Sequence, residues 1–135
     1  MMEGNMAELL LFNVEDPEKQ TAVRLTAMRL GLGCREIPPD RQGLTIGELL
    51  ENRVCSAPEA GEPFQEEMLL MHALSQEDFH TLLDTLRQNG QSIRLKAVVT
   101  DYNRGWTAAQ LRRELLTEEQ TIQRWKQSRH KQKKR

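Results

Sequence analysis

Residues 8–16, ELLLFNVED, and residues 67–75, EMLLMHALS, are two versions of one sequence pattern within a chain of 135 residues. Each version opens with an apolar run typical of a β-strand and continues into residues that start a helix. With a shift of 59 residues, seven positions are identical in the two halves. They are Glu8, Leu10, Leu11, Glu18, Thr26, Gly31 and Arg35, which align with Glu67, Leu69, Leu70, Glu77, Thr85, Gly90 and Arg94. The repeated order of signals predicts an internal duplication.

Both apolar runs are followed by a helix-start signal. Asp16-Pro17 combines an N-cap residue with proline at the first helical position, and Ser75 is a second N-cap residue. Each helix is expected to end at a glycine, Gly31 or Gly90, because glycine adopts the left-handed C-cap conformation without steric cost.

A second strand and a further helix complete each half. Residues 93–99 alternate, with Ile93, Leu95, Ala97 and Val99 expected on one side. The equivalent CREIPP, residues 34–39, ends in two prolines, which favours an edge strand. Further helices are predicted over residues 46–52 and 108–116.

Two strand–helix–strand units in a chain of this length predict an α+β fold. We expect duplicated βαβ(α) units that form a ferredoxin-like, four-stranded antiparallel sheet with its two crossover helices on one face. Two arrangements remain open for the extra helices: they cover the other face of the sheet, or they pair with another subunit.

The expected organisation is a single duplicated domain over residues 1–122. Its half-repeats span residues 8–52 and 67–119, and residues 53–66, which contain prolines, glycine and small residues, form the linker. Residues 123–135 form a basic tail.

The turn TDYNRGWT, residues 100–107, joins the last predicted strand to the last helix. Thr107 begins a capping box with Gln110, as Thr45 does with Glu48 in the first half. Trp106 is expected to close over Leu111 as a hydrophobic staple. These residues therefore have a structural explanation.

Residues 101–103, DYN, have no counterpart in the first half. Asp101 and Asn103 suit a turn, whereas Tyr102 combines an apolar ring with a hydroxyl, as is common in contact surfaces. An asymmetry within a duplication points to a binding site. The candidate ligand- or partner-binding residues are Lys96, Thr100, Asp101, Tyr102, Asn103, Arg104 and Trp106.

Residues 95–115, LKAVVTDYNRGWTAAQLRREL, resemble a bacterial family catalogued as domain of unknown function 3783. The matching motif positions are Lys96, Ala97, Val98, Val99, Thr100, Asn103, Trp106, Leu111 and Leu115. The resemblance covers about residues 67–119, and the first half is also similar to the N-terminal part of such proteins. A proline often follows the threonine in the family, where this chain has Asp101. The resemblance implies no activity, because the family has no assigned function.

Charge is distributed unevenly along the chain, although the net charge is only −1. Seven of the nineteen basic residues follow Gln123, which leaves twelve against twenty acidic residues in the body, about −8. The basic tail predicts either contact with nucleic acid, through counterion release, or a solvated terminus near the acidic body. The nucleic-acid candidates are Arg124, Lys126, Arg129, Lys131, Lys133, Lys134 and Arg135.

Several classes of protein are disfavoured by the sequence. The chain has no apolar run of the ~18 residues that span a bilayer, and MMEGNMAELLLF is unlike a secretory signal. Cys34 and Cys55 form no metal-type cluster, so a reduced, cytoplasmic protein is expected. His72 and His80 lack ligand partners at metal spacing. No nucleophile elbow, phosphate loop or zinc-protease motif occurs, and no cofactor is expected.

We therefore expect an uncharacterised, non-catalytic binding or regulatory module. It would act by self-association, as a homo-oligomer, or through a protein or small ligand at the turn of residues 100–106. The alternative is a nucleic-acid-associated protein that uses the basic tail. An enzyme is the third class, and no catalytic constellation can be assembled for it. No membrane partner is expected.

Overall fold

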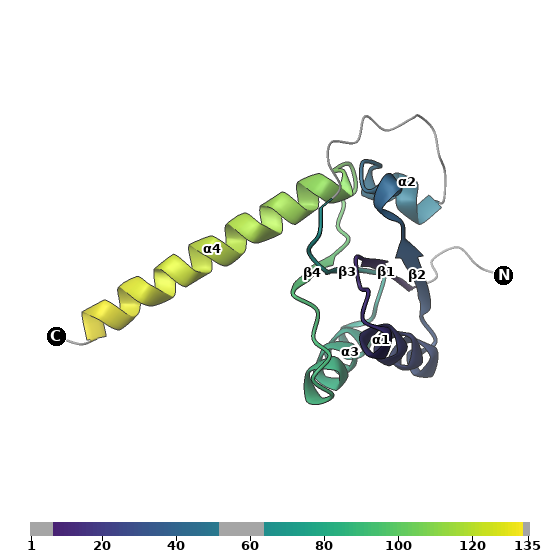
Figure 1. Cartoon of the computed structure of the whole chain (residues 1–135), viewed down its shortest axis with the longest axis horizontal. Coiled ribbons are helices and arrows are strands. Elements are labelled where there is room, and N and C mark those ends of the chain that lie inside the picture. The colour runs from purple at the N-terminus through teal and green to yellow at the C-terminus, as the bar shows by residue number, and fades with distance from the viewer. Residues whose placement is uncertain (1–6, 52–63, 134–135) are drawn as a thin grey trace.

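The computed structural model describes residues 7–51 and 64–133, with side chains as far as Gln127. A four-stranded sheet lies between helices (Figure 1). The elements in chain order are β1 (Glu8–Phe12), α1 (Pro17–Leu30), β2 (Gly33–Ile37), the 3-10 turn η1 (Pro39–Arg41), α2 (Ile46–Glu51), β3 (Met68–His72), α3 (Gln76–Gln88), β4 (Leu95–Val98) and α4 (Ala108–Lys133).

The sheet is mixed, with strand order β2-β1-β3-β4. β1 pairs with β2 in parallel, β3 pairs with β4 in parallel, and only the central β1–β3 pair is antiparallel. The α+β class is confirmed, but the predicted all-antiparallel sheet is wrong. In the ferredoxin-like split βαβ arrangement, a strand from the other unit separates the two strands of each unit. Here each unit keeps its own strands side by side.

Helices cover both faces of the sheet (Figure 1). α1 and α3 lie on one face over Leu9, Leu11 and their neighbours. α2 and the start of α4 lie on the other face over Leu10 and Phe12. The sequence left open whether the extra helices would pack there. Within this chain they do, because the central strands present large apolar side chains on both faces.

The central strand pair also fixes how the two halves correspond. Leu10 lies directly opposite Leu70, and both side chains belong to the cluster beneath α2 and α4. Leu69, which the shift of 59 residues aligned with Leu10, faces the opposite layer. In a strand a slip of one residue exchanges the faces, so aligning the two strands by the layer that they face needs a shift of 60. The positive-φ glycines Gly31 and Gly90 differ by 59. The internal duplication remains a prediction.

Local signals placed both helix starts and the end of α1 correctly. The Asp16 carboxylate accepts a hydrogen bond from the Glu18 amide, and the Ser75 hydroxyl accepts one from the Asp78 amide. Gly31 is the C-cap of α1 and has a φ of 74°, as predicted. α3 ends at Gln88 with Asn89 at the C-cap, and Gly90, one residue later than the cap, has a φ of 71°.

One expected side-chain orientation is wrong. Leu95 and Ala97 face α2 and α4, but Ile93 belongs to the cluster beneath α1 and α3. Ile93 lies before the first residue of β4, so the alternation of the strand does not extend to it.

The chain entering β3 is attached to α4. Most of the predicted linker, residues 53–66, lies outside the described residues, but Phe64 is buried and its ring lies 6.0 Å from that of Phe12. Glu66 accepts two hydrogen bonds from the Arg112 guanidinium, at 2.9 and 2.8 Å. The Arg112 guanidinium also lies 5.9 Å from the centre of the Phe64 ring. Residues 64–66 are therefore part of the packed structure.

The Glu66–Arg112 pair should make stability depend on pH. Hydrogen bonding from Arg112 lowers the pKa of Glu66 from 4.5 to about 2. A carboxyl group with a lowered folded-state pKa stabilises the fold above its unfolded pKa, and this contribution is lost as the pH falls through about 2. Glu66→Gln is expected to reduce the free energy of unfolding at pH 7 by about 1 kcal/mol. It should also flatten the loss of stability between pH 4.5 and 2.

Urea unfolding at a series of pH values measures both effects. Glu114→Gln is the matched control, because it changes an exposed carboxylate on α4, the helix that carries Arg112. A Glu66→Gln protein with the wild-type pH profile would show that the pair contributes nothing to stability.

Candidate functional site

The turn before α4 is part of a reciprocal cap between two helices. The first amides of α2, on Ile46 and Gly47, donate to the carbonyls of Trp106 and Arg104 at 2.9 and 3.0 Å. The first amides of α4, on Ala108 and Ala109, donate to the carbonyls of Leu44 and Gln42 at 3.2 Å each. Thr45 and Thr107 form a β-bridge between the two starts. Each helix thus supplies acceptors for amides that otherwise lack intrahelical partners.

Side-chain caps complete these two helix starts. The Thr45 hydroxyl accepts from the Glu48 amide at 3.1 Å, and Glu48 Oε1 accepts from the Thr45 amide at 2.9 Å. Thr107 Oγ1 accepts from the Gln110 amide at 3.0 Å. The capping box at Thr45 is confirmed in both directions, and at Thr107 the bond from the Gln110 amide to the threonine hydroxyl is confirmed. Trp106 packs against the cluster that contains Leu111, as the predicted staple requires.

Asn103 holds the turn together from the inside. Its side chain is 8% exposed. Its Oδ1 accepts from the Thr100 amide at 2.9 Å, and its Nδ2 donates to the Val98 carbonyl at 3.1 Å. The Asn103 amide donates to Thr100 Oγ1 at 3.1 Å. The polar groups of Asn103 and Thr100 therefore serve the backbone of the turn.

The other candidate residues are not gathered around one cavity. Lys96 donates from Nζ to the Ile93 carbonyl at 2.8 Å, on the exposed side of β4. Asp101 and Arg104 are exposed. Tyr102 is 86% exposed, and its ring centre lies 6.4 Å from that of Trp106. Tyr102 is thus the large side chain that this turn presents to the surroundings.

Charges near the turn act on the end of β3. Burial lowers the pKa of His72, and the positive charge of Arg104 lowers it further. His72 lies opposite Glu8 in the central strand pair. On the other half of the sheet, burial raises the pKa of the Cys34 thiol. A raised thiol pKa disfavours the nucleophilic thiolate at neutral pH.

Residues 123–133 of the predicted basic tail continue α4. The helix was predicted over residues 108–116, and the structure continues it to Lys133. Every described side chain from Gln120 onward is exposed. Figure 1 shows this part of α4 running away from the sheet on the β4 side. We call residues 120–133 the arm.

The arm carries two of the predicted nucleic-acid candidates with described side chains. Arg124 and Lys126 are exposed on it. The side chains of Arg129, Lys131, Lys133, Lys134 and Arg135 lie outside the described residues. Residues 123–127 of the tail are exposed, as expected for a solvated terminus, and they project away from the acidic body (Figure 1).

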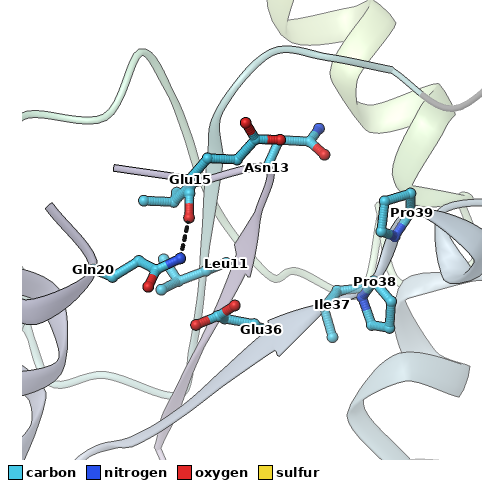
Figure 2. Close-up of a pocket in the computed structure, with 9 residues that line it drawn as sticks. Leu11, Asn13, Glu15, Gln20, Glu36, Ile37, Pro38 and Pro39 are labelled. Atoms are coloured by element: carbon cyan, nitrogen blue, oxygen red, sulfur yellow. Dashed lines mark hydrogen bonds between the residues drawn. The ribbon is translucent and has the colours of Figure 1, made fainter. Parts of the chain in front are cut away.

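Sequence reasoning missed a cavity of about 350 Å³ at the carboxyl ends of β1 and β2. Figure 2 shows its lining, which combines apolar and polar side chains. The lining residues are Leu11, Asn13, Val14, Glu15, Gln20, Glu36, Ile37, Pro38 and Pro39. We call it the β1–β2 pocket. The crevice beyond the carboxyl ends of parallel strands is where α/β sheets commonly bind ligands.

Most polar groups around the β1–β2 pocket are already bonded. Asn13, which has a φ of 62°, donates to the carbonyls of Phe64 and Glu66 and accepts from Gln42. Gln20 donates to the Val14 carbonyl (Figure 2).

Glu36 and Glu15 differ in their contacts. Glu36 accepts from Arg24 Nη2 at 2.6 Å. Within residues 7–51 and 64–127, Glu15 has no hydrogen-bond or ion-pair partner. Glu15 is exposed at the pocket. It is the carboxylate there whose charge is not compensated by a neighbouring cation.

Within the part of the chain that the structure describes, no group of three or more histidine, cysteine, aspartate or glutamate side chains is arranged to hold a metal ion. No helix there combines the length and the apolar character needed to cross a membrane.

Measurements of unfolding free energy can distinguish a structural role from a binding role for residues 101–103. Asn103→Ala should reduce the free energy of unfolding by about 1–3 kcal/mol, because it leaves the Thr100 amide and Val98 carbonyl without their partner. Tyr102→Ala should change it by less than about 0.5 kcal/mol, because the ring is largely exposed. Urea unfolding of the two variants provides the comparison. Equal stability of Asn103→Ala and wild type would contradict the structural role of Asn103.

Comparison with known proteins finds a similarity for the second half of the chain. No curated protein and no solved structure matches the sequence. A family model does match residues 67–122, which comprise β3, α3, β4, the turn and α4 as far as Ile122. The resemblance of this half is confirmed, while similarity of the first half remains a prediction. The matching model is described as Domain of unknown function (DUF3783), so residues 67–122 are similar to that family.

Proposed function

We propose that this protein is a non-catalytic binding module that self-associates through its C-terminal third. The observation that carries the proposal is the distribution of exposed apolar side chains. Among the described residues, six large hydrophobic side chains are exposed, and four of them follow the start of β4. These four are Val98, Tyr102, Ile122 and Trp125. Ile122 and Trp125 lie three residues apart on α4, which places them on neighbouring parts of one helix face. Exposed apolar side chains that adjoin in this way are typical of interaction surfaces.

The arm supports this proposal more directly than the turn does. Ile122 is 51% exposed and Trp125 is 57% exposed, beyond the part of α4 that packs on the sheet. Projection into solvent gives a helix little stabilisation from tertiary packing. A partner that covered these side chains would add the apolar burial that the monomer does not provide.

The turn supports a binding role rather than a catalytic one. Its buried asparagine and the neighbouring Thr100 and Lys96 are engaged with backbone atoms. Tyr102 is exposed at the base of the arm and close to Trp106. An exposed tyrosine next to a tryptophan supplies a rigid amphipathic contact area.

The double substitution Ile122→Ser, Trp125→Ser tests self-association. Wild type is expected to be larger than a monomer, and the variant monomeric, with an unchanged melting temperature of the body because both positions lie beyond the core. Sedimentation velocity over a range of concentrations measures the change. Leu25→Ser, Met28→Ser removes a comparable exposed apolar pair from α1 and is the matched control. A strictly monomeric wild type would overturn the proposal.

A second candidate function is nucleic-acid association through the arm. The arm has five basic and no acidic residues, and it is held away from the acidic body (Figure 1). A basic helix separated from its own carboxylates can reach a phosphate backbone, and the release of counterions would favour binding.

Salt dependence tests this candidate. If the arm contacts phosphates, Arg124→Gln, Lys126→Gln should weaken binding to mixed-sequence duplex DNA or RNA and reduce the slope of log K against log[salt] by about 1–2. Fluorescence anisotropy measures both. Arg29→Gln, Arg113→Gln, which neutralises two exposed arginines of the body, is the control. Equal weak binding by all three proteins would rule the candidate out.

A further inference from the structure

The arm has a chemical character that limits its partners. Ile122, Trp125 and Lys126 are exposed and share one face of the helix by their spacing, while Arg124 is exposed on the other side. Neither cation has an ion-pair partner in the described part of the chain. A surface that covers this part of the helix must therefore offer both apolar contact and negative charge.

Pairing of one arm with the arm of another copy does not meet this requirement. Each arm carries five basic residues and no acidic residue. Two such helices side by side would bring like charges together without compensation, which is destabilising. Self-association through the arm therefore requires a different, acidic surface on the second copy.

The β1–β2 pocket has the complementary character. Leu11, Val14, Ile37 and the two prolines supply apolar surface, and Glu15 supplies an uncompensated carboxylate. Around the pocket, residues 13–20 and 36–41 contain five acidic and two basic residues, Lys19 and Arg41, and Arg24 also reaches Glu36 at 2.6 Å. Lys19 is itself bonded to Glu67 at 2.7 Å. The pocket thus lies in an acidic part of an acidic body.

The arm of a chain does not reach the β1–β2 pocket of the same chain. The pocket lies at β2, which is one edge of the sheet, whereas α4 packs against β4 at the other edge. Figure 1 shows the arm leading further away from β2 along a continuous helix. A contact between these surfaces must therefore be between two copies.

We propose that the arm of one copy docks on the β1–β2 pocket of a second copy, with Ile122 and Trp125 on the apolar lining and Lys126 at Glu15. This inference rests on the proposed self-association and names its two surfaces. Because the two surfaces differ, the contact is heterologous. Two copies that exchange arms form a closed dimer, whereas copies that each dock on the next form an open chain of subunits.

Mixing of two full-length variants tests the contact. Arg124→Glu, Lys126→Glu changes the arm and leaves the pocket intact. Glu15→Lys changes the pocket and leaves the arm intact. Each variant alone is expected to dissociate at least about tenfold more readily than wild type, because like charges then meet at the contact. An equal mixture should form a heterodimer, since one intact arm and one intact pocket remain.

Sedimentation velocity with one variant fluorescently labelled measures heterodimer formation. Restored association in a chain that carries both Glu15→Lys and the arm reversal would give independent support, because the charges are then exchanged. Glu114→Lys, on the exposed face of α4 within the body, is the control for a general effect of charge. Circular dichroism melting shows that each variant is folded.

The outcomes separate this inference from the proposed function. If wild type associates but the mixture contains only monomers, the arm does not use the β1–β2 pocket, and self-association proceeds through another surface. If wild type is monomeric and the arm reversal abolishes only DNA or RNA binding, the pocket contact is overturned together with self-association. Association that is unchanged in both variants also overturns the contact.

Discussion

The burial of β1 and β3 on both faces is the constraint on which the rest of the structure depends. The side chains of Leu9 to Phe12 and of Met68 to Met71 are all almost completely inaccessible. Strands with apolar side chains on both faces need a layer of helices on each. One layer comes from α1 and α3, the two crossover helices. The second layer comes from α2 and α4, whose starts are close enough to exchange backbone hydrogen bonds.

Features that depend on neighbouring residues were predictable from the sequence. The caps at Asp16, Ser75, Thr45 and Thr107 follow from a side chain and an amide a few residues apart. Strand direction could not be obtained in this way, because it depends on which strands become neighbours in space. The runs LLLF and MLLM nevertheless contained a usable signal. They do not alternate with polar residues, and continuous apolar strands are typical of sheets covered on both faces.

The roles of single residues in the candidate site were also not predictable from neighbouring residues alone. An asparagine in a turn can bond to a ligand or to its own backbone, and sequence alone does not distinguish the two uses. The Asn103 side chain bonds to backbone groups, accepting from the Thr100 amide and donating to the Val98 carbonyl. The asymmetry of the DYN segment did identify Tyr102, which is largely exposed. The β1–β2 pocket brings together residues about 25 positions apart, so no local pattern indicated it.

The reciprocal cap has a consequence for how small a folding unit of this kind can be. The family-matched residues 67–122 contain the start of α4 but not the Leu44 and Gln42 carbonyls that accept its first amides. They also contain β3 without β1, its antiparallel neighbour. A chain of only those residues would have an open central edge and uncapped helix amides, both of which are costly when buried. In this protein the first half supplies both, since β1 covers the edge of β3 and residues 42–44 accept the first amides of α4.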